Sequence, residues 1–432
     1  MARRLNARAA DFGRQFKALI ESTRDTDEDV SRAVADIIAD VRARGDAALI
    51  ALSARFDRAA LTRATLRVSF QEIDDAYRAA DAEVKAALSL AASRIEAYHQ
   101  RQVPLDESFV DDTGARLGWR WTPIQSVGLY VPGGTASYPS SVLMNAVPAR
   151  VAGVQRIVMV TPATGGTINP LTLAAAKLAG VSEIYRVGGA QAVAALAYGT
   201  PTIAPVDKIV GPGNAYVAAA KRAVFGRVGI DSIAGPSEIL VVADGANDPA
   251  WIAADLLSQA EHDSSSQSIL ITDDAEFADR VAAAVDAQLK DLPRREIAQS
   301  SWQNHGAIIV VAKLDDAAPL VDAIAPEHLE IATAEPAQFF DRVKNAGAVF
   351  LGRYSPEAIG DYVAGPNHVL PTSRTARFSS GLSVLDFMKR TSVLSCDAGA
   401  LGALGPAGLT LAKAEGLGAH GRSIAIRLNR TS

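Results

Sequence analysis

The 432-residue sequence contains a single cysteine, Cys396. One cysteine excludes disulfide bonds within the chain and leaves almost no room for a metal site built from thiolates. This cysteine usage fits a reducing compartment, and we expect the protein in the cytoplasm. The basic N-terminal stretch MARRLNARAADFGRQF has no apolar centre. That absence excludes a secretory signal, although the arginines leave a transit peptide open.

Long apolar runs and a surplus of positive charge are also missing. No run approaches the roughly 18 consecutive apolar residues that a membrane helix needs. The net charge is −5 and the Lys and Arg residues are scattered, so the sequence predicts no nucleic-acid surface. What remains is 49% hydrophobic and 21% charged. This balance is typical of a globular protein, here long enough for two or more domains.

Helical patterns dominate the first quarter of the chain. Apolar residues recur at helical spacing over residues 27–44, and Gly45 ends this pattern. Further helical stretches are expected over 47–57 and 70–101. After residue 353 the pattern becomes loop-like, and residues 406–430 again predict helix.

Short apolar runs alternate with Ala-rich helical segments from residue 118 onward. Segments 150–162 and 177–189 share the pattern AGVxxI at a spacing of 27 residues, as expected for successive βα units of a parallel sheet. A second set of apolar runs begins near residue 230 with SEILVVADG. The sequence therefore predicts an α/β fold: two tandem, incomplete Rossmann-like domains with parallel sheets, and small helical segments at both ends.

The domain borders follow from these changes in pattern. Residues 1–25 are expected to form a helical arm. Residues 26–128 and 236–380 form the first Rossmann-like domain, residues 129–235 the second, and residues 381–432 a C-terminal tail domain.

Three glycine turns follow predicted strands in the second domain. They are YVPGGT (130–135), VGGAQAV (187–193) and VGPGNAYV (210–217). Free N–H groups at helix N-termini suit a pyrophosphate, but none of the turns is a full G-x-G-x-x-G motif. Each turn alone is better explained as a plain βα connection, whereas three in one domain favour a nucleotide nearby.

Amide, imidazole and carboxylate side chains gather near the ends of predicted elements. Gln259 and His262 stand three apart in LLSQAEHD, a segment that predicts helix, so both would lie on one face. They supply two of the N and O donors that zinc prefers. Asp361, His368 and His420 are candidates for the others, and spacing alone does not choose among them. Each histidine alone is better explained by local hydrogen bonds; several such neighbourhoods together favour a metal.

Glu327 and His328 are adjacent in APEHLEI. Neighbouring residues on a strand face opposite ways, but at a strand entry both can face one pocket. A histidine with an ordinary pKa can act as a base, and an adjacent carboxylate, ionised at neutral pH, can activate water.

Nine segments occur in the order found in one enzyme family. They are LYVPGG, VGGAQA, VGPGN, AGPSE, LLSQAEHD, APEHLE, GDYVAGPNHVLPT, ARFSSGLSV and EGLGAH. With these segments the sequence resembles the histidinol dehydrogenase family over essentially its whole length. The resemblance implies oxidation of L-histidinol to L-histidine through bound L-histidinaldehyde, the last step of histidine biosynthesis. It also implies two NAD⁺ and one water per turnover, one zinc ion per subunit, and a homodimer with shared active sites.

The resemblance also implies a role for each matching residue. Proton transfer would fall to Glu327 and His328. The zinc ligands would be Gln259, His262, Asp361 and His420, the last from the partner subunit. Substrate would contact these four zinc ligands, His328 and further side chains, namely Ser237, His368 and Glu415. NAD⁺ would contact the second domain through Tyr130, Gln191 and Asn214.

The chemistry itself narrows the mechanism. Hydride leaves a carbinol only as its O–H proton departs, which needs a base, and the aldehyde must be hydrated before a second hydride can leave. A covalent route through a thiolate is the alternative. Cys396 has no neighbouring base or cation in the sequence, so we expect it to be buried and inert.

Three other functions stay open from the residues. The first is a related zinc and NAD dehydrogenase acting on another small amino or sulfonated alcohol, which would need added Arg or Lys at the site. The second is a metallohydrolase with Glu327 as base. The third is a two-domain binding protein that closes on a hinge, which the crowding of titratable groups disfavours.

Overall fold

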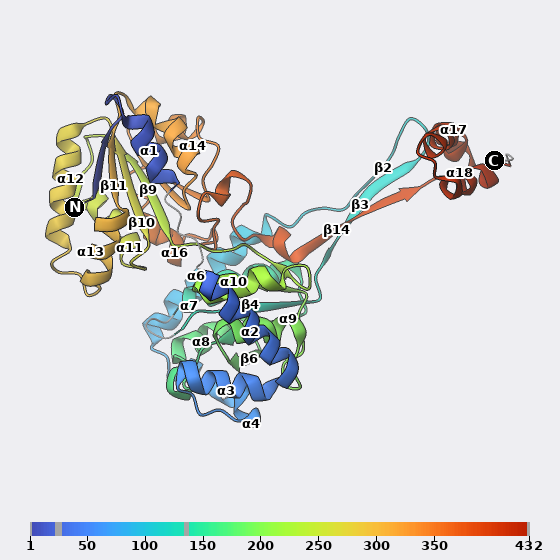
Figure 1. The fold of residues 1–432 in the computed structure, drawn as a ribbon, viewed down its shortest axis with the longest axis horizontal. Coiled ribbons are helices and arrows are strands. Elements are labelled where there is room, and N and C mark those ends of the chain that lie inside the picture. The colour runs from blue at the N-terminus through green and yellow to red at the C-terminus, as the bar shows by residue number, and fades with distance from the viewer. Residues whose placement is uncertain (1, 22–27, 134–137, 430–432) are drawn as a thin grey trace. The chain divides into compact units, whose positions relative to one another are not determined.

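The computed structural model describes residues 2–21, 28–133 and 138–429 (Figure 1). The chain divides into two compact units. The main unit comprises residues 1–102 and 125–387, and the terminal unit comprises residues 103–124 and 388–432.

Six parallel strands form sheet A of the main unit. Their order across the sheet is β1 (Arg3–Asn6), β11 (Ala307–Val310), β10 (Gln267–Thr272), β9 (Glu238–Ala243), β12 (His328–Ala332) and β13 (Ala348–Leu351).

Helices cover both faces of sheet A, so its strands are apolar on both sides (Figure 1). Ile239 and Val241 of β9 belong to the core under α11 (Pro249–Ala260), α12 (Ala275–Gln288) and α13 (Arg295–His305). Leu240 and Val242 alternate with them and belong to the core under α1 (Phe12–Ile20), α14 (Ala318–Ile324) and α15 (Pro336–Phe340).

Five parallel strands form sheet B of the main unit. Their order is β6 (Glu183–Arg186), β5 (Arg156–Thr161), β4 (Ser126–Tyr130), β7 (Lys208–Val210) and β8 (Gly229–Ile230). Its core includes side chains from α2 (Glu28–Arg44), α3 (Asp46–Asp57), α9 (Gly189–Tyr198) and α10 (Ala215–Val224). A further layer contains α5 (Phe70–Ala79), α6 (Ala82–Gln100), α7 (Pro139–Ala152) and α8 (Pro170–Ala179).

The two sheets share one connectivity. In sheet B the chain runs from β4 to β5 and β6 on one side and returns to place β7 and β8 on the other. In sheet A it runs from β9 to β10 and β11, and then to β12 and β13. The direction in which strands are added across the sheet therefore reverses between β4 and β7 in sheet B, and between β9 and β12 in sheet A. Such reversal points are where open α/β sheets form crevices.

The terminal unit is antiparallel. Its strands are ordered β14 (Met388–Ser395), β3 (Arg116–Pro123) and β2 (Glu107–Val110), and the chain then forms α17 (Ala398–Ala414) and α18 (Gly418–Ala425). The sequence predicted helix near this end and loop-like structure before it. Strand β14 was therefore missed.

The predicted fold class is confirmed, since two parallel sheets with covering helices are present. The predicted helix over 27–44 is confirmed from residue 28, because residue 27 lies outside the described residues. The predicted helix over 47–57 is confirmed as α3. The stretch 70–101 is broken at Ala80, whose backbone is extended, and Asp81 caps the second helix.

The grouping of segments differs from the predicted borders in three places. The expected helical arm contributes strand β1 to sheet A. Helices α2 and α3 pack on sheet B, although they were grouped with residues 236–380. Residues 103–124 pair with the end of the chain. An amphipathic pattern shows that one face of a helix is buried, and not against which partner.

No helix in the described ranges is both long and apolar enough to span a membrane.

Candidate functional site

The carboxyl edge of sheet B brings the three glycine turns together. Tyr130 ends β4, and its hydroxyl accepts a hydrogen bond from the Gly189 N–H at 3.0 Å. A Cβ at Gly211, just after β7, would collide with the Tyr130 carbonyl oxygen, so only glycine fits there. Burial raises the pKa of Tyr130 to about 12, and the phenol is neutral. Residues 134 and 135 of the first turn lie outside the described residues.

Two further predicted NAD contacts lie at this edge. Gln191 is buried in the first turn of α9. Asn214 caps α10, and its side-chain oxygen accepts hydrogen bonds from the Tyr216 and Val217 N–H groups at 3.1 and 3.2 Å. This cap gives Asn214 a structural role of its own, and its nucleotide contact stays a prediction.

The amino edge of sheet A holds the predicted proton-transfer pair. Glu327 precedes β12, and His328 is its first residue; both are buried. The Glu327 Oε2 atom accepts a hydrogen bond from the Glu238 N–H at 2.9 Å and lies 3.7 Å from His328 Nδ1. The two side chains therefore reach the same site from a strand entry, as the sequence allowed. Ser237 lies beside them, directly before β9.

The His328 ring is held in one tautomer. Its Nδ1 atom lies 3.0 Å from the Glu238 carbonyl oxygen, which can only accept, so Nδ1 carries the proton. The Nε2 atom is buried, and no hydrogen-bond partner for it occurs among the described residues. Burial lowers the pKa of His328, so the imidazole is neutral and Nε2 offers a lone pair. This is the state that a general base requires.

Glu327 differs from its expected state. Burial raises the pKa of this carboxyl well above its ordinary value, and the neighbouring Glu238 and Asp361 charges raise it further. The expectation of a carboxylate ionised at neutral pH is wrong for these side chains alone. A positive charge nearby would be needed to bring the pKa back down.

His328 belongs to a possible metal-binding group. One donor atom each from His328, Glu357 and Asp361 falls within 4.8 Å of the other two. The sequence interpretation missed Glu357, although Glu357 and Asp361 stand four apart in α16 (Glu357–Tyr362), a spacing that puts both on one helix face. The His328 Nε2 atom lies 3.7 Å from Glu357 Oε1.

Gln259 adds a buried oxygen to this region that accepts no hydrogen bond from the described residues. Its side chain lies at the end of α11 and is 1% exposed, and its Oε1 atom has no hydrogen-bond partner in the described part of the chain. A buried amide oxygen without a partner is costly unless an ion or ligand engages it. Amide, imidazole and carboxylate donors beside carboxyls that resist ionisation fit a divalent cation such as zinc.

Further buried carboxyls lie near Glu357. The Glu357 N–H donates to Glu330 Oε1 at 2.5 Å, and the Ser258 hydroxyl donates to Glu357 Oε2 at 3.2 Å. Burial raises the pKa of Glu357 to about 9 and that of Asp255 to about 6. The site is thus rich in acids that a cation would help to ionise.

His368 also points toward Asp361. Its Nδ1 atom lies 3.1 Å from the Asp361 carbonyl oxygen and 3.7 Å from Oδ1, and its Nε2 atom lies 3.3 Å from the Ser141 hydroxyl. Burial lowers the pKa of His368, and the ring is neutral.

Comparison with known proteins identifies the family. A model of the histidinol dehydrogenase family matches residues 20–428. A histidinol dehydrogenase of Rhodospirillum rubrum is 65% identical over 431 residues, which cover 100% of this chain and 99% of that protein. The chain belongs to the histidinol dehydrogenase family. It is therefore an oxidoreductase, and the recognition from the nine segments is confirmed.

Further relatives agree with this family. A histidinol dehydrogenase of Rhodopseudomonas palustris is 63% identical over 430 residues and covers 100% of both chains. The crystal structure of histidinol dehydrogenase from Elizabethkingia anophelis matches with a TM-score of 0.94 at 38% identity, covering 99% of this chain and 98% of that one.

Some predicted site residues of this family member lie at exposed positions. Helix α11 ends at Ala260, so His262 lies in the following turn and not in the helix. Its N–H still donates to the Gln259 carbonyl at 3.2 Å, which keeps the two residues one turn apart.

Glu415 and His420 belong to the terminal unit. Glu415 follows α17 and His420 lies in α18, and both are exposed. Their part in the site stays a prediction.

Cys396 is exposed directly after β14. The expectation of a buried thiol is wrong, because seven of the eight residues of β14 are themselves exposed.

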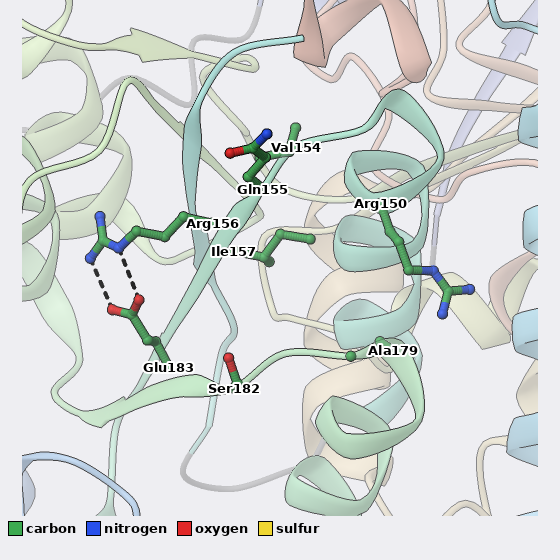
Figure 2. Close-up of a pocket in the computed structure, with 9 residues that line it drawn as sticks. Arg150, Val154, Gln155, Arg156, Ile157, Ala179, Ser182 and Glu183 are labelled. Carbon is green, nitrogen blue, oxygen red and sulfur yellow. Dashed lines mark hydrogen bonds and ion pairs between the residues drawn. The ribbon is translucent and has the colours of Figure 1, made fainter.

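A separate cavity of about 410 Å³ opens at the amino edge of sheet B (Figure 2). The Arg156 guanidinium there forms a bidentate ion pair with Glu183, with bonds of 2.9 and 3.0 Å, and also donates to the carbonyls of Ala204 and Pro205. Both charges are therefore satisfied within the protein. The cavity coincides with none of the predicted site residues.

Proposed function

We propose that this protein oxidises L-histidinol to L-histidine through bound L-histidinaldehyde, the last step of histidine biosynthesis. We also propose that the reaction uses a bound zinc ion and consumes two NAD⁺ per turnover. The observation that supports it is the buried His328, whose unprotonated Nε2 faces a cluster of metal-binding side chains.

His328 is the general base in both oxidations. Its Nε2 atom takes the hydroxyl proton as hydride leaves the carbinol carbon, while the Nδ1–H bond to the Glu238 carbonyl holds the ring. Once positive charge in the loaded site has ionised it, the nearby Glu357 carboxyl stabilises the imidazolium that forms. NAD⁺ supplies the hydride acceptor, with Tyr130, Gln191 and Asn214 as its contacts.

Glu327 serves the hydration between the two oxidations. A proton must leave the water that attacks the aldehyde, and Glu327 lies beside His328 to receive it. Because burial favours its neutral form, Glu327 accepts that proton only once positive charge in the loaded site has ionised it. After releasing its first proton to solvent, His328 takes the hydroxyl proton of the hydrate as the second hydride leaves.

Gln259, His262 and Asp361 would hold the zinc ion, with His420 of the partner subunit as the fourth ligand. The unpartnered Gln259 oxygen supports this assignment. Bound zinc would supply positive charge and an anchor for the amino and imidazole nitrogens of the substrate. Ser237, His368 and Glu415 orient the substrate around that anchor.

A homodimer with shared sites explains the surface of the terminal unit. Large apolar side chains are exposed there, including Leu105, Leu394, Leu411 and Ile426. Exposed apolar groups gathered in one small unit favour burial against a second subunit. Glu415 and His420 would then complete the partner's site.

Counting NADH tests the reaction. Purified protein loaded with zinc, given limiting L-histidinol and excess NAD⁺, should produce two equivalents of NADH and one of L-histidine. One equivalent of NADH together with free aldehyde would refute the four-electron oxidation. If no NADH forms, L-histidinol is not the substrate.

Coexpression tests the shared site. His262→Asn and His420→Asn should each abolish activity, but a heterodimer of the two variants regains one intact site. Activity of the isolated heterodimer should then approach half that of the wild type. No recovery would place His420 in the site of its own chain.

The second candidate is a dehydrogenase for another small alcohol. A sulfonated substrate needs arginine or lysine at the site. The side chains described next to His328 include the acids Glu327, Glu357 and Asp361, which favour a cationic substrate because its charge would ionise them. NADH formation with a sulfonated diol but not with L-histidinol would reverse this preference. The hydrolase and binding-protein alternatives do not fit a family of oxidoreductases.

A further inference from the structure

A buried ion pair holds the glycine turn that follows β7. Lys221 of α10 pairs with Asp231, just after β8, and their side chains are 2% and 4% exposed. The Lys221 Nζ atom donates to the Gly211 carbonyl at 3.0 Å, and the Gly211 N–H donates to Asp231 Oδ2 at 2.7 Å. The two halves of one ion pair therefore engage both polar groups of one glycine.

The conformation of Gly211 leaves no room for a side chain. Its φ of 111° lies in the region that only glycine adopts easily, and a Cβ would collide with the Tyr130 carbonyl oxygen. Side-chain packing is thus impossible at this residue, and its peptide groups are fixed through hydrogen bonds from Lys221 and Asp231.

Stability alone does not account for this pair. Burying two charges costs desolvation free energy, and apolar residues of the same volume often stabilise a fold equally well. A buried charge pair that also hydrogen-bonds to the backbone instead selects one geometry. Here that geometry belongs to the turn 211–214, beside the reversal point between β4 and β7.

We propose that Lys221 and Asp231 are positioning residues for NAD⁺. They hold the Gly211 peptide so that the turn 211–214 keeps the shape against which the dinucleotide binds. This inference rests on the proposed use of NAD⁺ at the carboxyl edge of sheet B.

Strand β7, which directly precedes Gly211, provides a matched control. Lys208, the first residue of β7, donates through Nζ to the Asp386 carbonyl at 2.7 Å and to Oδ1 at 3.1 Å. This Lys–Asp pair is also largely buried, with side chains 16% and 28% exposed, but it lies at the opposite end of β7. Breaking it should disturb the protein without changing the turn 211–214.

The test uses the zinc-loaded, full-length protein. NADH fluorescence titrations compare the wild type with Lys221→Met, the double variant Lys221→Met/Asp231→Asn, and the control Lys208→Met. The double variant leaves no buried charge unpaired. Both Lys221 variants should bind NADH about tenfold more weakly, since a hydrogen bond from a charged donor is lost. Zinc content, KM for L-histidinol and kcat at saturating NAD⁺ should stay near wild type, and the control should bind NADH normally.

Each outcome decides the inference. NADH affinity within twofold of wild type in the folded double variant, or an equal loss in Lys208→Met, would overturn it. Asp231→Asn conserves volume but removes the charge that holds Lys221, so it should also weaken NADH binding and provides the test if the methionine variants fail to fold; unchanged affinity there also overturns the inference. A wild type that binds no NADH and forms none from L-histidinol would instead refute the proposed function.

Discussion

The two parallel sheets of the main unit share one connectivity but carry their candidate groups at opposite edges. In sheet B the glycine turns follow the carboxyl ends of β4, β6 and β7. In sheet A the titratable residues Glu238, Glu327 and His328 lie at the amino ends of β9 and β12. Sheet B follows the usual rule for open α/β sheets, and sheet A does not.

The chemistry of each edge accounts for this difference. The carboxyl edge of sheet B offers backbone turns, a neutral phenol and two amides, which suit a dinucleotide. The amino edge of sheet A offers buried imidazole and carboxyl groups, whose pKa values burial has shifted. Shared topology therefore does not imply a shared role for the two sheets, because the side chains at each edge decide the chemistry.

The largest expected effect separates the two edges. His328→Asn removes the base, and turnover should fall roughly 10²- to 10⁴-fold. NADH affinity should stay at the wild-type value, because the change lies at sheet A. Steady-state rates and NADH titrations on the same preparation measure both quantities.

Zinc content of the same variant checks the division of roles. Donor atoms of His328, Glu357 and Asp361 lie close enough together to bind one metal ion. In our proposal, however, His328 transfers protons and does not bind the metal. A zinc content near one equivalent per subunit in His328→Asn supports the role of His328 as the base. Loss of zinc would place His328 among the metal ligands.

A smaller effect concerns the buried carboxyls at sheet A. Glu357 has a pKa of about 9 against an ordinary 4.5, so the folded protein keeps a proton that the unfolded chain releases. Its stabilising effect is complete below the ordinary pKa and is lost as the pH rises through about 9. Protein stripped by a chelator should lose roughly 1.4 kcal/mol of unfolding free energy per pH unit for each such carboxyl. His328 and His368 have lowered pKa values and add nothing to this change above pH 7.

Urea unfolding at pH 7, 8 and 9 measures this loss. Glu357→Gln should flatten the profile, whereas Glu335→Gln, at an exposed position, should leave it unchanged. Added zinc should also flatten it, because a cation favours the ionised carboxyls. A stripped protein whose stability is constant or rises over this range contradicts the prediction.

The smallest effect is expected outside both sheets. Cys396 is exposed in the terminal unit, and Cys396→Ser should leave kcat and the NADH yield unchanged. Free aldehyde accumulating in this variant would move the second oxidation to a thiol and break the assignment of the chemistry to sheet A.

Local patterns predicted parts of this fold and site well. The apolar runs of β9, β10, β11 and β13 and the helix over 27–44 follow from periodicity, which depends only on nearby residues. Glu327 and His328 were singled out as a base and a water-activating acid that could share one pocket at a strand entry or loop, and β12 begins at His328.

Other features required long-range contacts. Strand β14 is exposed and pairs with β3, more than 260 positions earlier in the chain, so no local pattern marks it. The state of Glu327 is similar, since burial beneath distant segments raises its pKa.

By itself, the amino-acid sequence determined the alternation of strands and helices, the family, and the residue types available for chemistry. Only the tertiary structure decided which edge of each sheet carries those residues, which ring nitrogen of His328 is free, and that Glu357 joins the cluster. The physical reason is that secondary structure depends on neighbours along the chain, whereas burial, pKa and metal-binding geometry depend on neighbours in space.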